Sequence, residues 1–277
     1  MTVSYPAPQP ESVVNAPAPY VPPASARWGI LEAGIGLVVL IVVLFGGATV
    51  TTLIPGLDPN SGQFWFGVVA YGLIVVYLVI VSFTRGQRSL VKDFGLRFRW
   101  IDLPLGFGIA FVARILSAIF VLIATGFTGT LPEGGNVQLG DDKLWAVLYG
   151  VLIGSLLAPL VEELFFRGLV LRAVRHAVLR GPGRLRAQPA ASDVQKWAAG
   201  IAAFVSAALF AALHFNSAFD TTLIIALTLS TFAFGLLNAV VTLRTGRMGA
   251  AIIAHVLFNG FAIAVLLAFG DELAKLT

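Results

Sequence analysis

The chain has no cysteine, only three histidines, and charged side chains on just 12% of its 277 residues. The absence of cysteine excludes disulfide bonds, thiol catalysis and lipid attachment through a cysteine. The charged fraction is half of the roughly 25% that is typical of soluble domains, so an ordinary soluble fold is excluded as well. Any histidine chemistry must come from His176, His214 or His255.

Hydrophobic residues make up 58% of the chain, and the mean hydropathy is +0.90. A bilayer is crossed by ~20 apolar residues in a helix. Segments of about this length lie at 29–53, 63–84, 103–126, 144–171, 197–216, 221–243 and 248–270. They predict an all-α polytopic membrane protein with about seven transmembrane helices, or eight if a re-entrant piece is present. The transmembrane domain is expected over residues 27–277.

Residues outside the apolar segments predict the orientation of the chain. Residues 1–26 contain seven prolines and one acidic residue, which is typical of a disordered tail. They lack the basic start and apolar core of a cleavable signal peptide. Fourteen Lys and Arg lie on one side of the spans and two on the other, so we expect a cytoplasmic N-terminus and an external C-terminus in the cell membrane. Basic loops at the inner leaflet explain the net charge of +4 without a nucleic-acid partner.

Two adjacent carboxylates, Glu162 and Glu163, interrupt the fourth apolar segment. Ionisable residues inside a span are costly and are candidates for a function. Glu163 and Arg167 are four residues apart, so they can pair on one helix face. Glu162 points about 100° away and finds no partner on its own helix. The spacing therefore predicts one carboxylate that is held by an ion pair and one that is free for chemistry.

Further polar residues lie in other spans. His214 is late in the fifth segment, and His255 and Asn259 share one face of the seventh. Each of them taken alone is more simply explained as a hydrogen-bonding contact between helices. Arg114, in the third segment, needs a partner, which is either one of the two glutamates or backbone carbonyls. Other polar residues have ordinary explanations at the interface or on the backbone: Glu32, His176, Ser206, Thr231 and Asn238.

Together these groups permit hydrolysis. A carboxylate in a poorly solvated site can act as a general base or acid near neutral pH, and a neutral imidazole beside it can orient the attacking water. A second histidine and an Asn carboxamide offer hydrogen-bond donors to a developing oxyanion. No serine accompanies these residues, so a Ser-His-Asp triad is not indicated.

Three motifs in this order resemble the signature of the CPBP family of intramembrane proteases: Glu162-Glu163-x-x-x-Arg167, Phe210-x-x-x-His214 and His255-x-x-x-Asn259. Members include CAAX prenyl endopeptidases and bacteriocin-processing enzymes, also called the Abi family. The resemblance covers residues 144–270 as the catalytic core. It implies that Glu162 activates water with His214, that His255 and Asn259 form the oxyanion hole, and that Glu163 and Arg167 hold the site together.

The resemblance leaves the metal and the substrate open. Relatives have been described both as metalloproteases and as glutamate-dependent enzymes without metal. A zinc site would use Glu162, His214 and His255, but Asn259 fits a donor role better than a ligand role, so we expect no metal and no other cofactor. The expected partners are the lipid bilayer and a membrane-associated protein or peptide substrate. A basic insert at about 180–195, which lengthens the spacing from Glu162 to His214, leaves the substrate and partner unassigned.

Other functions predict other sequence features. A non-catalytic scaffold or bacteriocin-immunity protein of the same fold would be marked by the loss of a motif residue, and none is lost. A transporter would show two similar halves with broken helices, whereas only Pro159 breaks a span. Helix rise places Glu162, His255 and Asn259 at ~12–18 Å from the inner interface. For His214 to reach that depth, the helices flanking the insert must project from the membrane as a basic hairpin.

Overall fold

A computed structural model describes residues 27–54, 59–132, 142–180, 192–217 and 220–273. The tail over 1–26 and most of the insert at 180–195 lie outside these residues. In the described ranges all regular structure is helical, which confirms the all-α prediction. The elements are α1 Ile30–Thr52, α2 Pro59–Arg85, α3 Leu90–Phe94, α4 Asp102–Thr128, α5 Lys143–Val147, η1 Leu148–Leu157, α6 Ala158–Glu163, η2 Leu164–Val170, α7 Leu171–Arg180, α8 Ser192–Ala212, η3 Leu213–Ser217, α9 Thr221–Thr245 and α10 Gly249–Leu273.

The helices are long and apolar enough for a polytopic membrane protein. In the described part of the chain, six helical stretches can cross a bilayer by length and composition, and Ile30–Leu44 in α1 is a shorter apolar stretch. These seven coincide with the seven predicted segments. Large apolar side chains such as Leu122 and Phe127 are mostly exposed, as expected of helices that face lipid.

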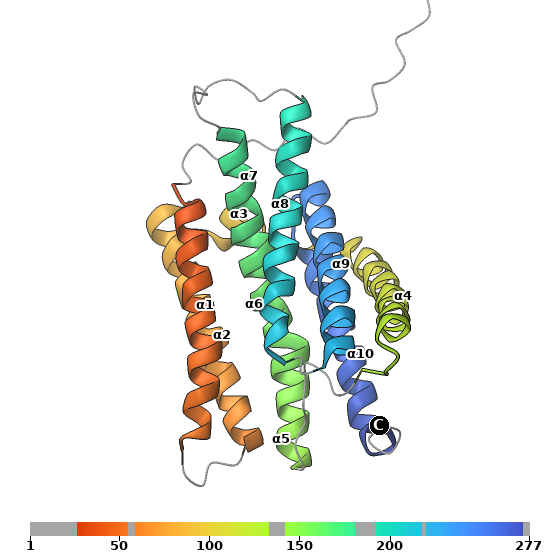
Figure 1. Cartoon of the computed structure of the whole chain (residues 1–277). Helices are drawn as coiled ribbons and strands as arrows, with labels where there is room; N and C mark the ends of the chain where they lie inside the picture. The colour runs from red at the N-terminus through yellow and green to blue at the C-terminus, as the bar shows by residue number, and fades with distance from the viewer. Residues whose placement is uncertain (1–26, 55–58, 133–141, 181–191, 218–219, 274–277) are drawn as a thin grey trace, which may run out of the picture.

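The central element is the continuous helical stretch from α5 to α7, drawn in green (Figure 1). The α1–α2 pair lies on one side of it, and α8, α9, α10 and α4 follow on the other (Figure 1). At one end α7 and α8 pack together and extend beyond α1 and α2 (Figure 1). This arrangement resembles the expected hairpin, but its position relative to a membrane stays a prediction.

Two π-helical stretches, η1 and η2, flank the six-residue α6 that ends in Glu163. Hydropathy does not distinguish π- from α-helix, so the sequence predicts only one uninterrupted span. In α-helical proteins π-turns occur frequently at functional sites, because they widen the helix and redirect side chains. Here they bracket the only two carboxylates of the stretch from Lys143 to Arg180.

Buried ion pairs and hydrogen bonds fix the end of the bundle near α3. Asp102, at the start of α4, is fully buried and pairs with Arg247 just before α10, at 2.7 Å. Asp93 in α3 is also buried and accepts hydrogen bonds from Trp28 Nε1 and Ser82 Oγ, at 3.3 and 2.6 Å. The first contact ties the start of α4 to the start of α10, and the second set ties the start of α1 and the end of α2 to α3.

The two remaining charges in the spans find partners. Glu32 receives a hydrogen bond from the Gly29 N–H at 2.7 Å and lies 3.6 Å from Arg85, whose side chain is 51% exposed. Arg114 donates to the backbone carbonyl of Phe258, so the backbone alternative predicted for it is the correct one.

Candidate active site

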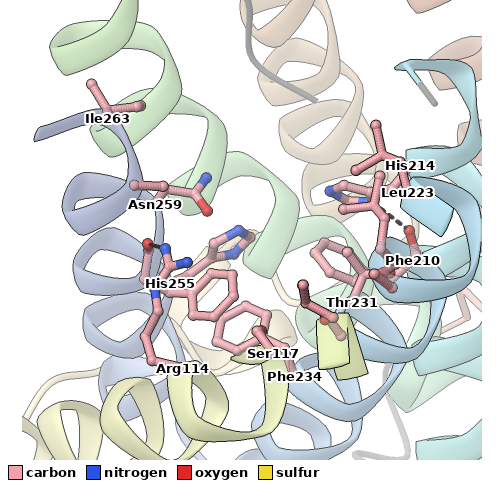
Figure 2. A pocket seen from close by; sticks show the side chains of 16 residues that line it. Arg114, Ser117, Phe210, His214, Leu223, Thr231, Phe234, His255, Asn259 and Ile263 are labelled. Atoms are coloured by element: carbon pink, nitrogen blue, oxygen red, sulfur yellow. Dashed lines mark hydrogen bonds between the residues drawn. The ribbon is translucent and has the colours of Figure 1, made fainter. Parts of the chain in front are cut away.

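The candidate site is a cavity of about 180 Å³ enclosed by α4, α8, η3, α9 and α10. Its walls are mainly apolar, and its polar groups include His214, His255, Asn259 and Arg114. Seen from close by, His214 and Phe210 come from one side and Asn259 and Arg114 from the other, with the His255 ring between them (Figure 2). Along α9 the lining runs from Leu223 to Phe234, which corresponds to ~16 Å at 1.5 Å per residue.

Glu163 organises the interior behind this cavity. Its carboxylate is fully buried and pairs with Arg167 Nε at 3.2 Å, so the expected i,i+4 ion pair is present. Asn238 Nδ2 donates to Glu163 Oε1 at 3.0 Å, and His255 Nδ1 lies 2.9 Å from the same oxygen. Arg167 also donates to the Gly235 carbonyl at 3.1 Å. Glu163 thus connects to η2 through an ion pair, and to α9 and α10 through charge-assisted hydrogen bonds, which are the strong ones.

Glu162 has different surroundings. Its side chain remains 19% exposed, and its Oε2 lies 3.8 Å from His255 Nε2. Tyr71 of α2 donates its hydroxyl hydrogen to Glu162 Oε1 at 2.9 Å. One carboxylate oxygen of Glu162 therefore accepts a hydrogen bond from the Tyr71 phenol, and the other faces His255.

His214 lies just after α8, where the chain tightens into the 3₁₀ turn η3. Its Nδ1 is 2.8 Å from the Phe210 carbonyl, and because a carbonyl oxygen can only accept, Nδ1 carries a hydrogen. In a neutral ring this leaves Nε2 as a proton acceptor. The Phe210 ring packs against the imidazole, with 4.6 Å between ring centroids.

His255 is held in the same way by its Nδ1, which must donate because the Glu163 carboxylate accepts. Asn259, one turn further along α10, donates from Nδ2 to the Gly154 carbonyl of η1 at 3.0 Å. A carboxamide nitrogen has two hydrogens, so one N–H of Asn259 is left after this bond. The side chain is thereby oriented by the π-helical stretch.

The structure brings His214, His255 and Asn259 to one cavity, while Glu162 reaches them from behind His255. Within the described residues no hydrogen bond or ion pair joins Glu162 to His214, and the closest imidazole recorded for Glu162 is that of His255. The pairing of Glu162 with His214 through a bridging water stays a prediction.

The zinc alternative names Glu162, His214 and His255. Across the described residues, no three His, Asp or Glu side chains are grouped closely enough to hold a metal ion. His176 lies apart from the cavity, with its ring centroid 5.2 Å from that of Trp28.

Comparison with known families adds to this geometry. Residues 144–261 match the family model described as type II CAAX prenyl endopeptidase Rce1-like. This part of the chain is an Rce1-like domain. No curated protein and no solved structure matches the chain. The match contains all three motifs and confirms the resemblance to the CAAX endopeptidases.

Two partners of the glutamates were not predicted. Asn238 lies within the Rce1-like domain and had been given an ordinary backbone role, yet it bonds directly to Glu163. The sequence did carry a signal, because Asn238 is a carboxamide within an apolar span, and the structure buries it fully. Tyr71 lies before the domain, and nothing in its sequence context distinguishes it from Tyr77, the other tyrosine of α2.

Proposed function

We propose that the chain is an intramembrane endopeptidase in which Glu162 and His214 activate water and His255 and Asn259 stabilise the oxyanion. The observation that carries this proposal is the convergence of η3 and α10 on one cavity, with Glu162 of α6 close behind His255. His214 comes from η3, His255 and Asn259 come from α10, and Glu162 lies 3.8 Å from His255 at the end of α6. The match of residues 144–261 to the CAAX prenyl endopeptidases supports the same reaction class.

Water activation requires a group that accepts a proton. His214 meets this requirement because its Nδ1–H is used on Phe210, which leaves Nε2 available. The Glu162 carboxylate accepts one hydrogen bond from Tyr71, and its second oxygen can receive a proton from water. A water held between Glu162 and His214 would attack the peptide carbonyl, and its proton would pass to the departing amine.

Stabilisation of the oxyanion requires donors. Asn259 has one N–H left after its bond to Gly154. His255 can donate from Nε2 only when both ring nitrogens are protonated, because Nδ1–H is already used on Glu163. The two carboxylates beside its ring, Glu162 and Glu163, would together balance that imidazolium and the Arg167 guanidinium that pairs with Glu163.

The substrate is a peptide segment that reaches this cavity inside the bilayer, and the family name makes a prenylated peptide a candidate. Most of the lining is apolar, with Val121, Leu223 and Ile263 among its residues. An apolar wall of this kind suits a lipid-modified or hydrophobic segment. We propose no metal and no other cofactor.

The test begins by finding the substrate. Membrane peptides from cells with wild-type protein are compared by mass spectrometry with those from cells with Glu162→Ala. A quenched fluorescent peptide is then made that spans a bond cleaved in the wild-type cells but intact in the Glu162→Ala cells. It is added to purified protein in lipid vesicles. Glu162→Gln and His214→Ala should abolish cleavage, and His255→Ala and Asn259→Ala should lower it by about 10²–10³. Glu32→Gln makes the same change at a glutamate outside the cavity and should retain activity.

Full activity of purified, folded Glu162→Gln would overturn the proposal. Identical membrane peptides in the two cell types would favour a non-catalytic scaffold of the same fold.

Glutamine substitutions separate the roles of the two histidines. A glutamine side chain donates hydrogen bonds but does not take up a proton near neutral pH. His255→Gln should therefore be more active than His255→Ala, whereas His214→Gln should be as inactive as His214→Ala. The opposite pattern would assign the proton-accepting role to His255, which is the imidazole nearer to Glu162 in the structure.

A further inference from the structure

Arg114 brings a positive charge into the cavity that no described carboxylate neutralises. Its guanidinium lines the same space as His255 and Asn259 (Figure 2). Of its hydrogen bonds the structure records one, to the neutral Phe258 carbonyl, and the guanidinium carbon lies 3.8 Å from the centre of the Phe258 ring. Within the described residues Arg114 forms no ion pair, in contrast to Arg167.

Donors remain at this position for a ligand. A guanidinium has five N–H groups, and in the described structure Arg114 Nε is buried and makes no hydrogen bond. Ser117 lies one turn along α4 and lines the same cavity, and its buried Oγ likewise has no partner among the described residues. Unmade hydrogen bonds of buried groups are costly, and a cation inside a span is costly as well.

We infer that Arg114 and Ser117 form a subsite that binds a carboxylate of the substrate. This inference rests on the proposed peptidase function and extends it by naming a charged group that the substrate must carry. Arg114 and Ser117 lie on α4, outside the segment that matches the family model. An anion held here completes the hydrogen bonds of both side chains and neutralises the cation, and a guanidinium suits a carboxylate because it donates in parallel.

The geometry limits where the carboxylate lies in the peptide. Arg114 bonds to the backbone of Phe258, the neighbour of Asn259, so the subsite begins beside the proposed oxyanion hole. The cavity is ~16 Å long along α9, which an extended chain crosses in about five residues. The bound carboxylate is therefore within about five residues of the cleaved bond, and it is either the free C-terminus of the substrate or an acidic side chain.

Binding to the inactive Glu162→Gln protein tests the subsite separately from catalysis. Three fluorescent S-farnesylated peptides serve as probes. Two have the same sequence and end in a free carboxylate or in an amide, and the third is an amidated peptide with aspartate as its last residue. We expect the free carboxylate to bind about 10- to 100-fold more tightly than the amide, as for a hydrogen bond between charged groups. Recovery of affinity by the aspartate peptide would show that a side-chain carboxylate also serves.

The preference for carboxylate over amide should collapse when Arg114→Gln is added, because glutamine can bond to the Phe258 carbonyl but has no charge. Arg114→Lys should retain part of the preference, and Ser117→Ala should reduce it by a smaller factor. Arg244→Gln is the matched control, because it removes an exposed cation outside the cavity and should leave the ratio as it is.

The inference is overturned if the peptides bind equally, if none binds, or if the ratio does not depend on Arg114. It is also overturned if Arg114→Gln slows cleavage of the carboxylate and amide peptides by one factor, because Arg114 would then act on the reacting carbonyl or on the fold. Failure of the wild-type protein to cleave any peptide would count against the proposed function, whereas the binding ratio would still decide the subsite.

Discussion

Breaking the Glu163–Arg167 pair should destabilise the folded protein strongly, and breaking both members at once should cost much less than the sum. Both side chains are 0% exposed and lie 3.2 Å apart. Removing one partner of a buried pair leaves an uncompensated charge and costs about 3–5 kcal/mol. Replacing both partners by neutral side chains of similar size removes that charge and is often close to neutral.

The experiment is a double-mutant cycle with Glu163→Gln, Arg167→Met and the two combined. Glutamine keeps an oxygen that can accept from Asn238, so the cycle chiefly measures the charge. Reversible unfolding of the purified proteins in mixed detergent micelles gives the free energy of unfolding of each variant. We expect each single variant to lose about 3–5 kcal/mol and the double variant to recover at least ~2 kcal/mol of the sum.

A second ion pair of the chain serves as the control. Arg85 is 51% exposed and lies 3.6 Å from Glu32, and an exposed pair contributes about 0–1 kcal/mol. Arg85→Gln should therefore change the free energy of unfolding by less than ~1 kcal/mol. Single variants of the buried pair that unfold like the parent protein, or costs that add without coupling, would refute the reasoning.

Other predictions concern the orientation of Glu162, the metal and the topology. Tyr71→Phe removes the donor to Glu162 Oε1 and should lower kcat about tenfold with little change in KM. Tyr77→Phe loses only a bond to the backbone carbonyl of Glu32 and should leave kcat as it is. Equal effects of the two substitutions would refute a positioning role for Tyr71. Activity should survive exhaustive chelation with substoichiometric zinc in the purified protein, and loss that only zinc restores would reverse this expectation. Because the chain has no cysteine, single cysteines at Lys92 and Lys143 can be labelled with a membrane-impermeant thiol reagent in intact cells, and only the cysteine at Lys143 should react.

The sequence predicted the elements well where the signal is local. A run of apolar residues indicates a spanning helix, because the backbone must satisfy its own hydrogen bonds in lipid. The pairing of Glu163 with Arg167 follows from helix periodicity alone. Both features appear in the structure at the expected residues.

Features that depend on contacts between distant elements were not predicted. Tyr71 meets Glu162 across 91 positions of the chain, and Asn238 meets Glu163 across 75. In the π-helical stretches a backbone N–H bonds to the carbonyl five residues earlier and not four. The apolar residues of η1 give no sequence signal for this difference. Helix rise predicted that Glu162, His255 and Asn259 lie at a similar distance from the inner membrane interface. It did not show that the His255 ring lies between the carboxylates of Glu162 and Glu163.

The charges inside the bundle suggest how a substrate would be oriented. Of the two described cations near the cavity, Arg167 is neutralised by Glu163, and Arg114 has no carboxylate. Of the two adjacent carboxylates, Glu163 is bound on both oxygens and Glu162 is left with a phenol and the nearby His255. The charge without a partner is therefore positive on α4, whereas the carboxylate available for chemistry is on α6. A peptide whose anionic group contacts Arg114 would place its scissile carbonyl toward Glu162, and its remaining part would leave the cavity away from α4. In this arrangement the contact with Arg114 that selects the substrate also sets the direction in which the peptide chain lies in the cavity.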